Sequence, residues 1–107
     1  MELSEWFHVS FDEAGVHREV NPPGGEAWSD QFAWGDVIRV CLKGGDLFES
    51  DELYIFTRQR PESYVIPTEA EGGLALLDEL VKHRLFDAQL AIEAATATEG
   101  LWCWPEE

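Results

Sequence analysis

Positive charge is scarce in this chain. Only seven of its 107 residues are Lys or Arg, against 22 Asp and Glu, and the formal net charge at pH 7 is -15. Proteins bind nucleic acids and anionic membranes largely through Lys and Arg, so the composition disfavours both as partners. A basic protein is the favoured partner, because opposite charges accelerate and orient association. The alternative is that the acidic charge only keeps the protein soluble.

The sequence also lacks long hydrophobic runs. No segment approaches the roughly 20 apolar residues of a membrane-spanning helix. The first residues, Met1 to Trp6, contain neither the basic start nor the apolar stretch of a secretory signal. We therefore expect a cytoplasmic protein that does not bind a membrane.

Cysteine is equally rare. The two that occur, Cys41 and Cys103, lie far apart in the sequence and do not have the close pairing typical of a zinc site. Disulfides seldom persist in the cytoplasm. We therefore expect two reduced thiols, with a Cys41–Cys103 bridge as the alternative.

Apolar residues, in contrast, are abundant. They make up 45% of the chain and include five Trp, which predicts a folded protein rather than a disordered acidic tail. The length is that of one domain, residues 1–107. The charge is uneven, because residues 1–36 hold eight acids and one base, residues 37–66 five and four, and residues 67–107 nine and two.

The first part of the chain predicts a β-hairpin. Apolar and polar residues alternate over 6–11 and again over 16–20, and residues 12–15 have the composition of a turn. If residue 11 lies opposite residue 16, Ser10 faces His17 and His8 faces Glu19. These four polar side chains then share one face of the hairpin.

The middle of the chain is rich in β-forming residues and the end in helix-forming residues. We expect strands at 31–34, 36–43, 52–58 and 63–66, with 52–58 central and with Ile38, Val40 and Leu42 on one face of 36–43. Helical spacing predicts a helix from about Gly73. Asp87 can cap a second helix, although 87–98 is open to either a helix or a strand. Residues 101–104 can dock as a final strand.

Strands first and helices last indicate the α+β class. We expect a curved antiparallel sheet of about five to six strands with one or two C-terminal helices.

Part of this pattern resembles a known family. Trp34, Asp36 and Ile38, then residues 51–55, then 64–67 before a Leu-rich helix, are similar to small bacterial pleckstrin-homology-like domains over about residues 30–85. The resemblance implies a curved sheet whose open end is plugged by a C-terminal helix, and a role as an interaction module. It assigns no site residue.

The polar face of the first hairpin is the best candidate for a metal site. His8, His17 and Glu19 are of the ligand types that zinc uses, and the two histidines are diagonal neighbours in the expected register. The alternative is a solvated polar face. Ser10 and His17 make a weak acyl-transfer pair, since no acidic partner or oxyanion hole is evident.

Acidic and aromatic residues supply the candidates for partner binding. The segment 46–52 is too apolar at Leu47 and Phe48 for a calcium loop, so we expect a solvated acidic loop. We expect Trp6 and Trp28 to be partly exposed, and exposed aromatic residues often anchor interfaces. We expect Trp34, Trp102 and Trp104 to pack in the core or to dock the C-terminal segment. The candidate partner-binding residues are Trp6, Trp28, Asp46, Glu49, Asp51 and Glu52.

These observations favour a non-enzymatic, acidic protein-interaction module that needs no cofactor. Its partner is a basic protein, and immunity-type inhibition of a basic toxin is one specific version. The alternative is a small metal-dependent enzyme that uses His8, His17 and Glu19. A third possibility is a structural subunit of an oligomer, and the sequence leaves the oligomeric state open.

Overall fold

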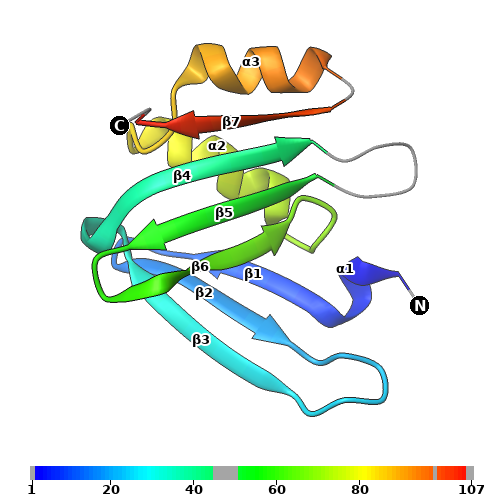
Figure 1. Ribbon diagram of the computed structural model, residues 1–107. Helices are drawn as coiled ribbons and strands as arrows, with labels where there is room; N and C mark the ends of the chain where they lie inside the picture. The colour runs from blue at the N-terminus through cyan, green and yellow to red at the C-terminus, as the bar shows by residue number, and fades with distance from the viewer. Residues whose placement is uncertain (1, 45–50, 98, 106–107) are drawn as a thin grey trace.

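The computed structural model describes residues 2–44, 51–97 and 99–105. The chain forms two antiparallel sheets and three α-helices within these residues, which confirms the α+β class (Figure 1). The elements are α1 (Leu3–Trp6), β1 (Phe7–Phe11), β2 (Gly15–Val20), β3 (Trp28–Ala33), the 3-10 helix η1 (Trp34–Asp36), β4 (Val37–Gly44), β5 (Glu52–Thr57), β6 (Arg60–Pro67), α2 (Gly73–Lys82), α3 (Ala88–Thr96) and β7 (Gly100–Trp104).

The three-stranded sheet has the order β1-β2-β3. Its first hairpin has the predicted register, with Ser10 opposite His17 and His8 opposite Glu19. Strand β3 is longer than the expected strand at 31–34, because it already begins at Trp28. It pairs with β2 along its whole length.

The four-stranded sheet has the order β6-β5-β4-β7, so β5 is an inner strand, as predicted. The expected facing of β4 is wrong at one residue. A β-bulge between Val37 and Arg39 shifts the alternation, and Ile38 is 52% exposed instead of sharing the buried face of Val40 and Leu42.

The chain forms two sheets where the sequence predicted one, because η1 interrupts it between β3 and β4. Trp34 in η1 is buried, and its indole Nε1 donates a hydrogen bond to the Asp12 carbonyl oxygen at 2.8 Å. Its ring also stacks on His83 after α2, with centroids 4.1 Å apart. These contacts fix the corner at which the chain passes from one sheet to the other.

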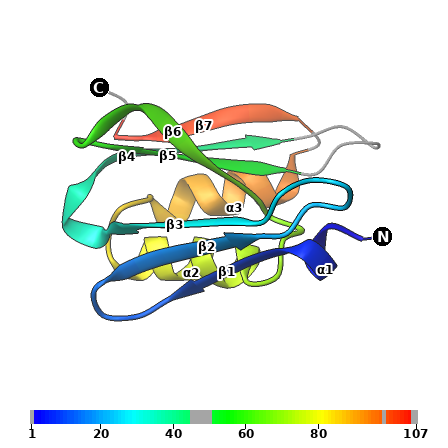
Figure 2. The ribbon, with the colours of Figure 1, turned by 90° about the horizontal axis from the view of Figure 1, so that it is seen from below.

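The hydrophobic core lies between the two sheets and is completed by α2 and the segment after it. Figure 2 shows α2 running beside β1, against which it packs. Leu76 and Leu80 of α2 are fully buried, and so is Phe86, which follows the helix. Burial of apolar area of this kind is the main favourable contribution to folding. The fully buried strand residues are Val16, Val40, Leu53, Ile55 and Ile66.

The two main helices begin where the sequence indicates. Helix α2 starts at Gly73, as predicted. Residues 88–96 form a helix, which settles the alternative left open for this segment. The Asp87 side chain accepts a hydrogen bond from the Leu90 backbone N–H, as expected of an N-cap. Among the described residues, no helix has the length and apolar character needed to span a bilayer.

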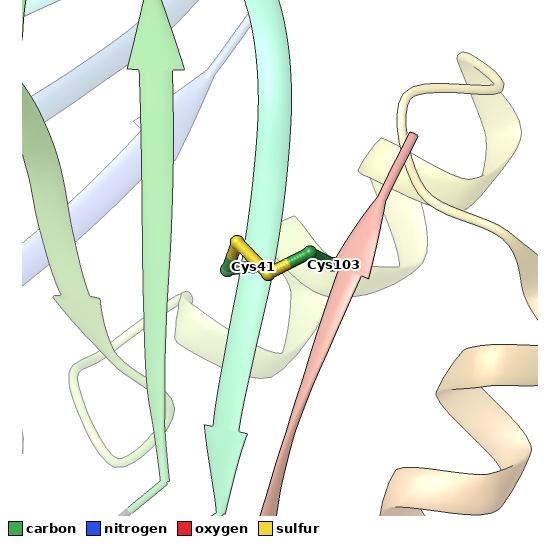
Figure 3. Close-up of a disulfide and its surroundings, with 2 residues drawn as sticks. All are labelled: Cys41 and Cys103. Carbon is green, nitrogen blue, oxygen red and sulfur yellow. A yellow bond between two sulfur atoms is a disulfide. The ribbon is translucent and has the colours of Figure 1, made fainter. Parts of the chain in front are cut away.

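The expectation of two reduced thiols is wrong, because Cys41 and Cys103 form a disulfide. Strand β7 pairs with β4 as the final strand and places Cys103 directly opposite Cys41. The bridge was the alternative to reduced thiols, and its formation depends on the return of the chain after α3. Figure 3 shows the bond in front of the strands with α2 behind them, which places it on the outer face of the four-stranded sheet. Disulfides are typical of oxidising compartments, so the cytoplasmic location stays a prediction.

Candidate interaction surface

The outer face of the three-stranded sheet is mostly polar. His8, Ser10, His17 and Glu19 share this face, as the register predicted, and Ser29 and Gln31 of β3 continue it. A shallow, open hollow runs along these strands and reaches Glu71 at the margin of the sheet. The sheet thus presents hydrogen-bonding groups, rather than apolar side chains, on the face that points away from the core.

The two histidines on this face belong to separate pairs. His8 Nδ1 lies 2.9 Å from Glu71 Oε1, and His17 Nε2 lies 3.3 Å from Asp12 Oδ2. Glu19 shares the face, but no pair to either histidine is formed within the described residues. In the same residues, no three His, Cys, Asp or Glu side chains are grouped so that they could hold a metal ion. The geometry does not assemble the zinc site that the sequence suggested.

Asp12 contributes a stable negative charge to the turn of the first hairpin. Its Oδ1 accepts hydrogen bonds from the backbone N–H groups of Ala14 at 2.8 Å and Gly15 at 3.1 Å. These bonds, with a smaller effect of His17, lower the pKa of the Asp12 carboxyl below its ordinary value of 3.8. The carboxylate is therefore ionised throughout the neutral and mildly acidic range.

The two tryptophans predicted to contact a partner lie in different environments. Trp6 is partly buried and packs against the core, with its ring centroid 6.2 Å from that of Phe7. Trp28 is 43% exposed at the first position of β3. Of these two, only Trp28 therefore offers a large apolar surface to a partner without a rearrangement of the core.

Two of the predicted acidic residues, Asp51 and Glu52, lie at the start of β5. Asp46 and Glu49 fall outside the described residues. The Asp51 backbone oxygen accepts a hydrogen bond from the Thr68 N–H at 2.9 Å, and the Glu52 carboxylate accepts one from the Tyr54 hydroxyl at 3.0 Å. Both residues thus take part in local structure beside β5.

Arg18 is the residue that organises the surroundings of Trp28. It lies on the inner face of β2 with its side chain 8% exposed. The guanidinium binds Asp30 of β3 through two parallel hydrogen bonds, from Nε to Oδ1 and from Nη2 to Oδ2. Its Nη1 donates a third bond to the Val65 carbonyl oxygen of β6 at 3.0 Å. A buried guanidinium needs such partners, and these link the two sheets.

The same guanidinium lies between two aromatic rings. Its Cζ is 4.8 Å from the centroid of Trp28 and 5.0 Å from that of Tyr64. The Cζ of Arg60 lies 3.7 Å from the Tyr64 centroid. Trp28, Arg18, Tyr64 and Arg60 thus form a row in which rings and cations alternate, and cation–π attraction stabilises each contact. Trp28 is exposed, but its ring is held in place by the Arg18 guanidinium.

Sequence reasoning missed Arg18 and Asp30, although one signal was available. In the correct hairpin register, Arg18 falls between Val16 and Val20 on the apolar face of β2. A charge at such a position requires an opposite charge on a neighbouring strand. Asp30 lies directly opposite Arg18 in β3, but the β2–β3 register had not been predicted.

The buried position of Arg18 also determines the charge of the surrounding surface. It is the only Lys or Arg among residues 2–36, so this part of the chain exposes no Lys or Arg side chain. The exposed acidic residues of this region include Glu13, Glu19 and Glu26. We call the polar outer face, these carboxylates and Trp28, which lies on the opposite face at the edge strand β3, the acidic surface of the three-stranded sheet.

Comparisons with known proteins add no assignment to this geometry. No family model matches the chain, and neither the curated proteins nor the solved structures provide a match. The resemblance to pleckstrin-homology-like domains therefore stays a prediction.

Proposed function

We propose that this protein is a non-enzymatic interaction module that binds a basic protein partner through the acidic surface of the three-stranded sheet. The observation that carries the proposal is the exposure of Trp28 and its contact with Arg18. A large aromatic side chain is exposed and held against a buried guanidinium, and residues 2–36 expose no Lys or Arg side chain. Aromatic anchors supply much of the affinity of interfaces, and the surrounding charge selects and orients the partner.

Immunity-type inhibition of a basic toxin would be one instance of such binding. The metal-dependent alternative is not proposed, because the described residues do not bring His8, His17 and Glu19 together as ligands.

The proposal is tested with a synthetic basic peptide of about ten residues in which Lys alternates with Val, a length that suits a β-strand. Isothermal titration at low and at physiological salt measures its affinity. We expect binding that weakens as salt is raised, since exposed charges are screened. A peptide with Glu in place of Lys serves as the charge control and should not bind.

The position of the site is tested with two tryptophan variants. Trp28→Ala removes the proposed anchor, and Trp104→Ala removes a tryptophan of similar exposure, 39%, on the other sheet. We expect Trp28→Ala to weaken binding about tenfold or more, the effect of losing an interface anchor. Trp104→Ala should change it by less than about twofold. Equal effects of the two variants, or binding that does not depend on salt, would contradict the proposal.

A further inference from the structure

Two open sheets have four edge strands, and an exposed edge is a template for another strand unless it is covered. The edge of β1 is covered by the segment before α2. Val9 donates its backbone N–H to the Glu71 carbonyl oxygen at 2.8 Å, and Glu71 donates its own to the Phe7 carbonyl oxygen at 2.9 Å. The outward Phe7 carbonyl and Val9 N–H of β1 are thus already paired.

The edge of β6 is covered by arginine side chains. Arg18 Nη1 donates to the Val65 carbonyl oxygen at 3.0 Å, and Arg60 Nη2 donates to the Ser63 carbonyl oxygen at 3.2 Å. Guanidinium groups therefore occupy the acceptors that a further strand would need.

The edge of β7 is covered by α3, which runs beside it (Figure 1). Leu90 of α3 borders the same surface hollow as Leu101 and Cys103 of β7. A helix laid along an edge strand is a common means of preventing further pairing.

The edge of β3 has no such cover. Trp34 donates its N–H to the Ala14 carbonyl oxygen next to the β2–β3 ladder. The antiparallel alternation therefore turns the backbone groups of Trp28, Asp30 and Phe32 toward β2 and those of Ser29, Gln31 and Ala33 away from it. Within residues 2–44, 51–97 and 99–105, these outward groups have no hydrogen-bond partner. Ser29, Gln31 and Ala33 are all exposed.

We propose that the open edge of β3 receives an extended, basic segment of the partner protein as a fourth strand of this sheet. This inference rests on the proposed function and adds the mode of binding, in which backbone hydrogen bonds supply affinity and alternate side chains supply specificity. The Asp30 carboxylate does not repel an added strand, because it is already paired with Arg18.

Charge decides between the two possible occupants of this edge. A second copy of the chain would bring together two acidic surfaces on molecules that each carry a net charge of -15. A basic strand meets the opposite condition. In an alternating Lys–Val strand the Lys side chains share one face and would lie near Glu19, and the Val side chains would lie on the face of Trp28. The edge therefore fits a basic partner and opposes self-pairing.

The experiment compares two forms of the Lys–Val peptide that carry the same charge. The first is unmodified, and the second is N-methylated at several consecutive central residues, which blocks both of its strand edges. We expect the unmodified peptide to bind about tenfold or more tightly, the loss expected when several interface hydrogen bonds are removed. Amide hydrogen exchange by NMR should slow at Ser29, Gln31 and Ala33 when the unmodified peptide is bound.

The outcomes separate the two proposals. If both peptides bind equally, the acidic surface is a binding site but strand addition is wrong. If neither binds, both proposals fail. If the amides of Ser29, Gln31 and Ala33 become protected at high protein concentration without peptide, the edge pairs with a second copy and the proposed occupant is wrong.

A pair of variants at Gln31 tests the same edge from the side of the protein. Gln31→Pro removes the central outward donor and leaves the ladder to β2 intact, whereas Gln31→Val keeps the donor. We expect Gln31→Pro to lose about tenfold in affinity for the unmodified peptide and Gln31→Val to stay within about threefold. Equal affinity of the two variants would overturn strand addition. If Gln31→Pro does not fold, the N-methylated peptide decides the question.

Discussion

The two sheets of this domain use charged side chains in opposite ways. The three-stranded sheet places its one basic residue, Arg18, on the inner face and leaves a polar, acidic outer face. Strands β4, β5 and β6 of the four-stranded sheet come from about residues 37–66, in which five acids are nearly balanced by four bases, and a disulfide joins β4 to the fourth strand, β7. The first sheet is thus fixed by a polar link and presents its charge to a partner, whereas the second is fixed covalently.

The largest effect is expected when the polar link between Arg18 and Asp30 is broken. Arg18→Met should lower the free energy of unfolding by about 3 to 5 kcal/mol, because it leaves Asp30 without the partner that compensates its partial burial. Urea denaturation measures the loss. Arg58→Met is the matched control. Its pair with Asp36 is 3.9 Å long and its side chain is 65% exposed, so this variant should cost less than about 1 kcal/mol.

A double variant shows whether the charge pair itself matters. Arg18→Met combined with Asp30→Leu removes both charges, and a buried pair replaced by apolar residues often costs little. We expect the double variant to be more stable than Arg18→Met alone. If Arg18→Met proves no worse than Arg58→Met, the polar link does not fix the first sheet.

The second largest effect is expected when the Cys41–Cys103 disulfide of the four-stranded sheet is removed. Cys41→Ser combined with Cys103→Ser should lower the free energy of unfolding by about 2 to 4 kcal/mol, since the bond closes a long loop of 62 residues in the unfolded chain. Denaturation of the oxidised protein, the reduced protein and the double variant measures it. The reduced protein and the variant should agree, and equal stability of all three would show that the bond contributes nothing.

A smaller effect sharpens the difference between covered and open edges. Gly72 and Gly24 both have positive φ, 84° and 76°, but their surroundings differ. A Cβ at Gly72 would lie 2.1 Å from the Val9 carbonyl oxygen of β1, whereas a Cβ at Gly24 would meet nothing within 4 Å. Both changes to Ala carry backbone strain of about 1 kcal/mol, and Gly72→Ala must in addition displace the segment that covers β1.

Thermal denaturation should therefore show a larger loss for Gly72→Ala than for Gly24→Ala. Hydrogen exchange at the Val9 amide, which is bonded to Glu71, should speed up only in Gly72→Ala. Equal melting temperatures for the two variants would mean that the segment covering β1 can be displaced without a loss of stability.

Local patterns made much of this fold predictable. The alternation around the turn at residues 12–15 gave the correct hairpin register, and hence the shared polar face of His8, Ser10, His17 and Glu19. The start of α2 at Gly73 and the cap at Asp87 also followed from neighbouring residues. Each of these features depends on interactions between residues a few positions apart, and such interactions can be recognised from the sequence.

The features that escaped prediction depend on distant residues. The division into two sheets needs the burial of Trp34 against the first hairpin, and the disulfide needs β7 to return beside β4. Arg18 was missed as a site residue because its partners, Asp30 and the Val65 carbonyl, come from other strands. Asp46 and Glu49, which lie outside the described residues, drew attention by composition, whereas the open edge of β3 is a property of backbone groups that no residue type reveals.

The uncovered edge of β3 has a consequence for the behaviour of the protein in solution. An unprotected strand edge is a route to aggregation, and among the described residues no side chain blocks this one. Mutual repulsion between molecules of net charge -15 opposes pairing at this edge instead. The open edge is therefore tolerated because the protein is strongly acidic. Colloidal stability will fall as acidification neutralises the carboxylates.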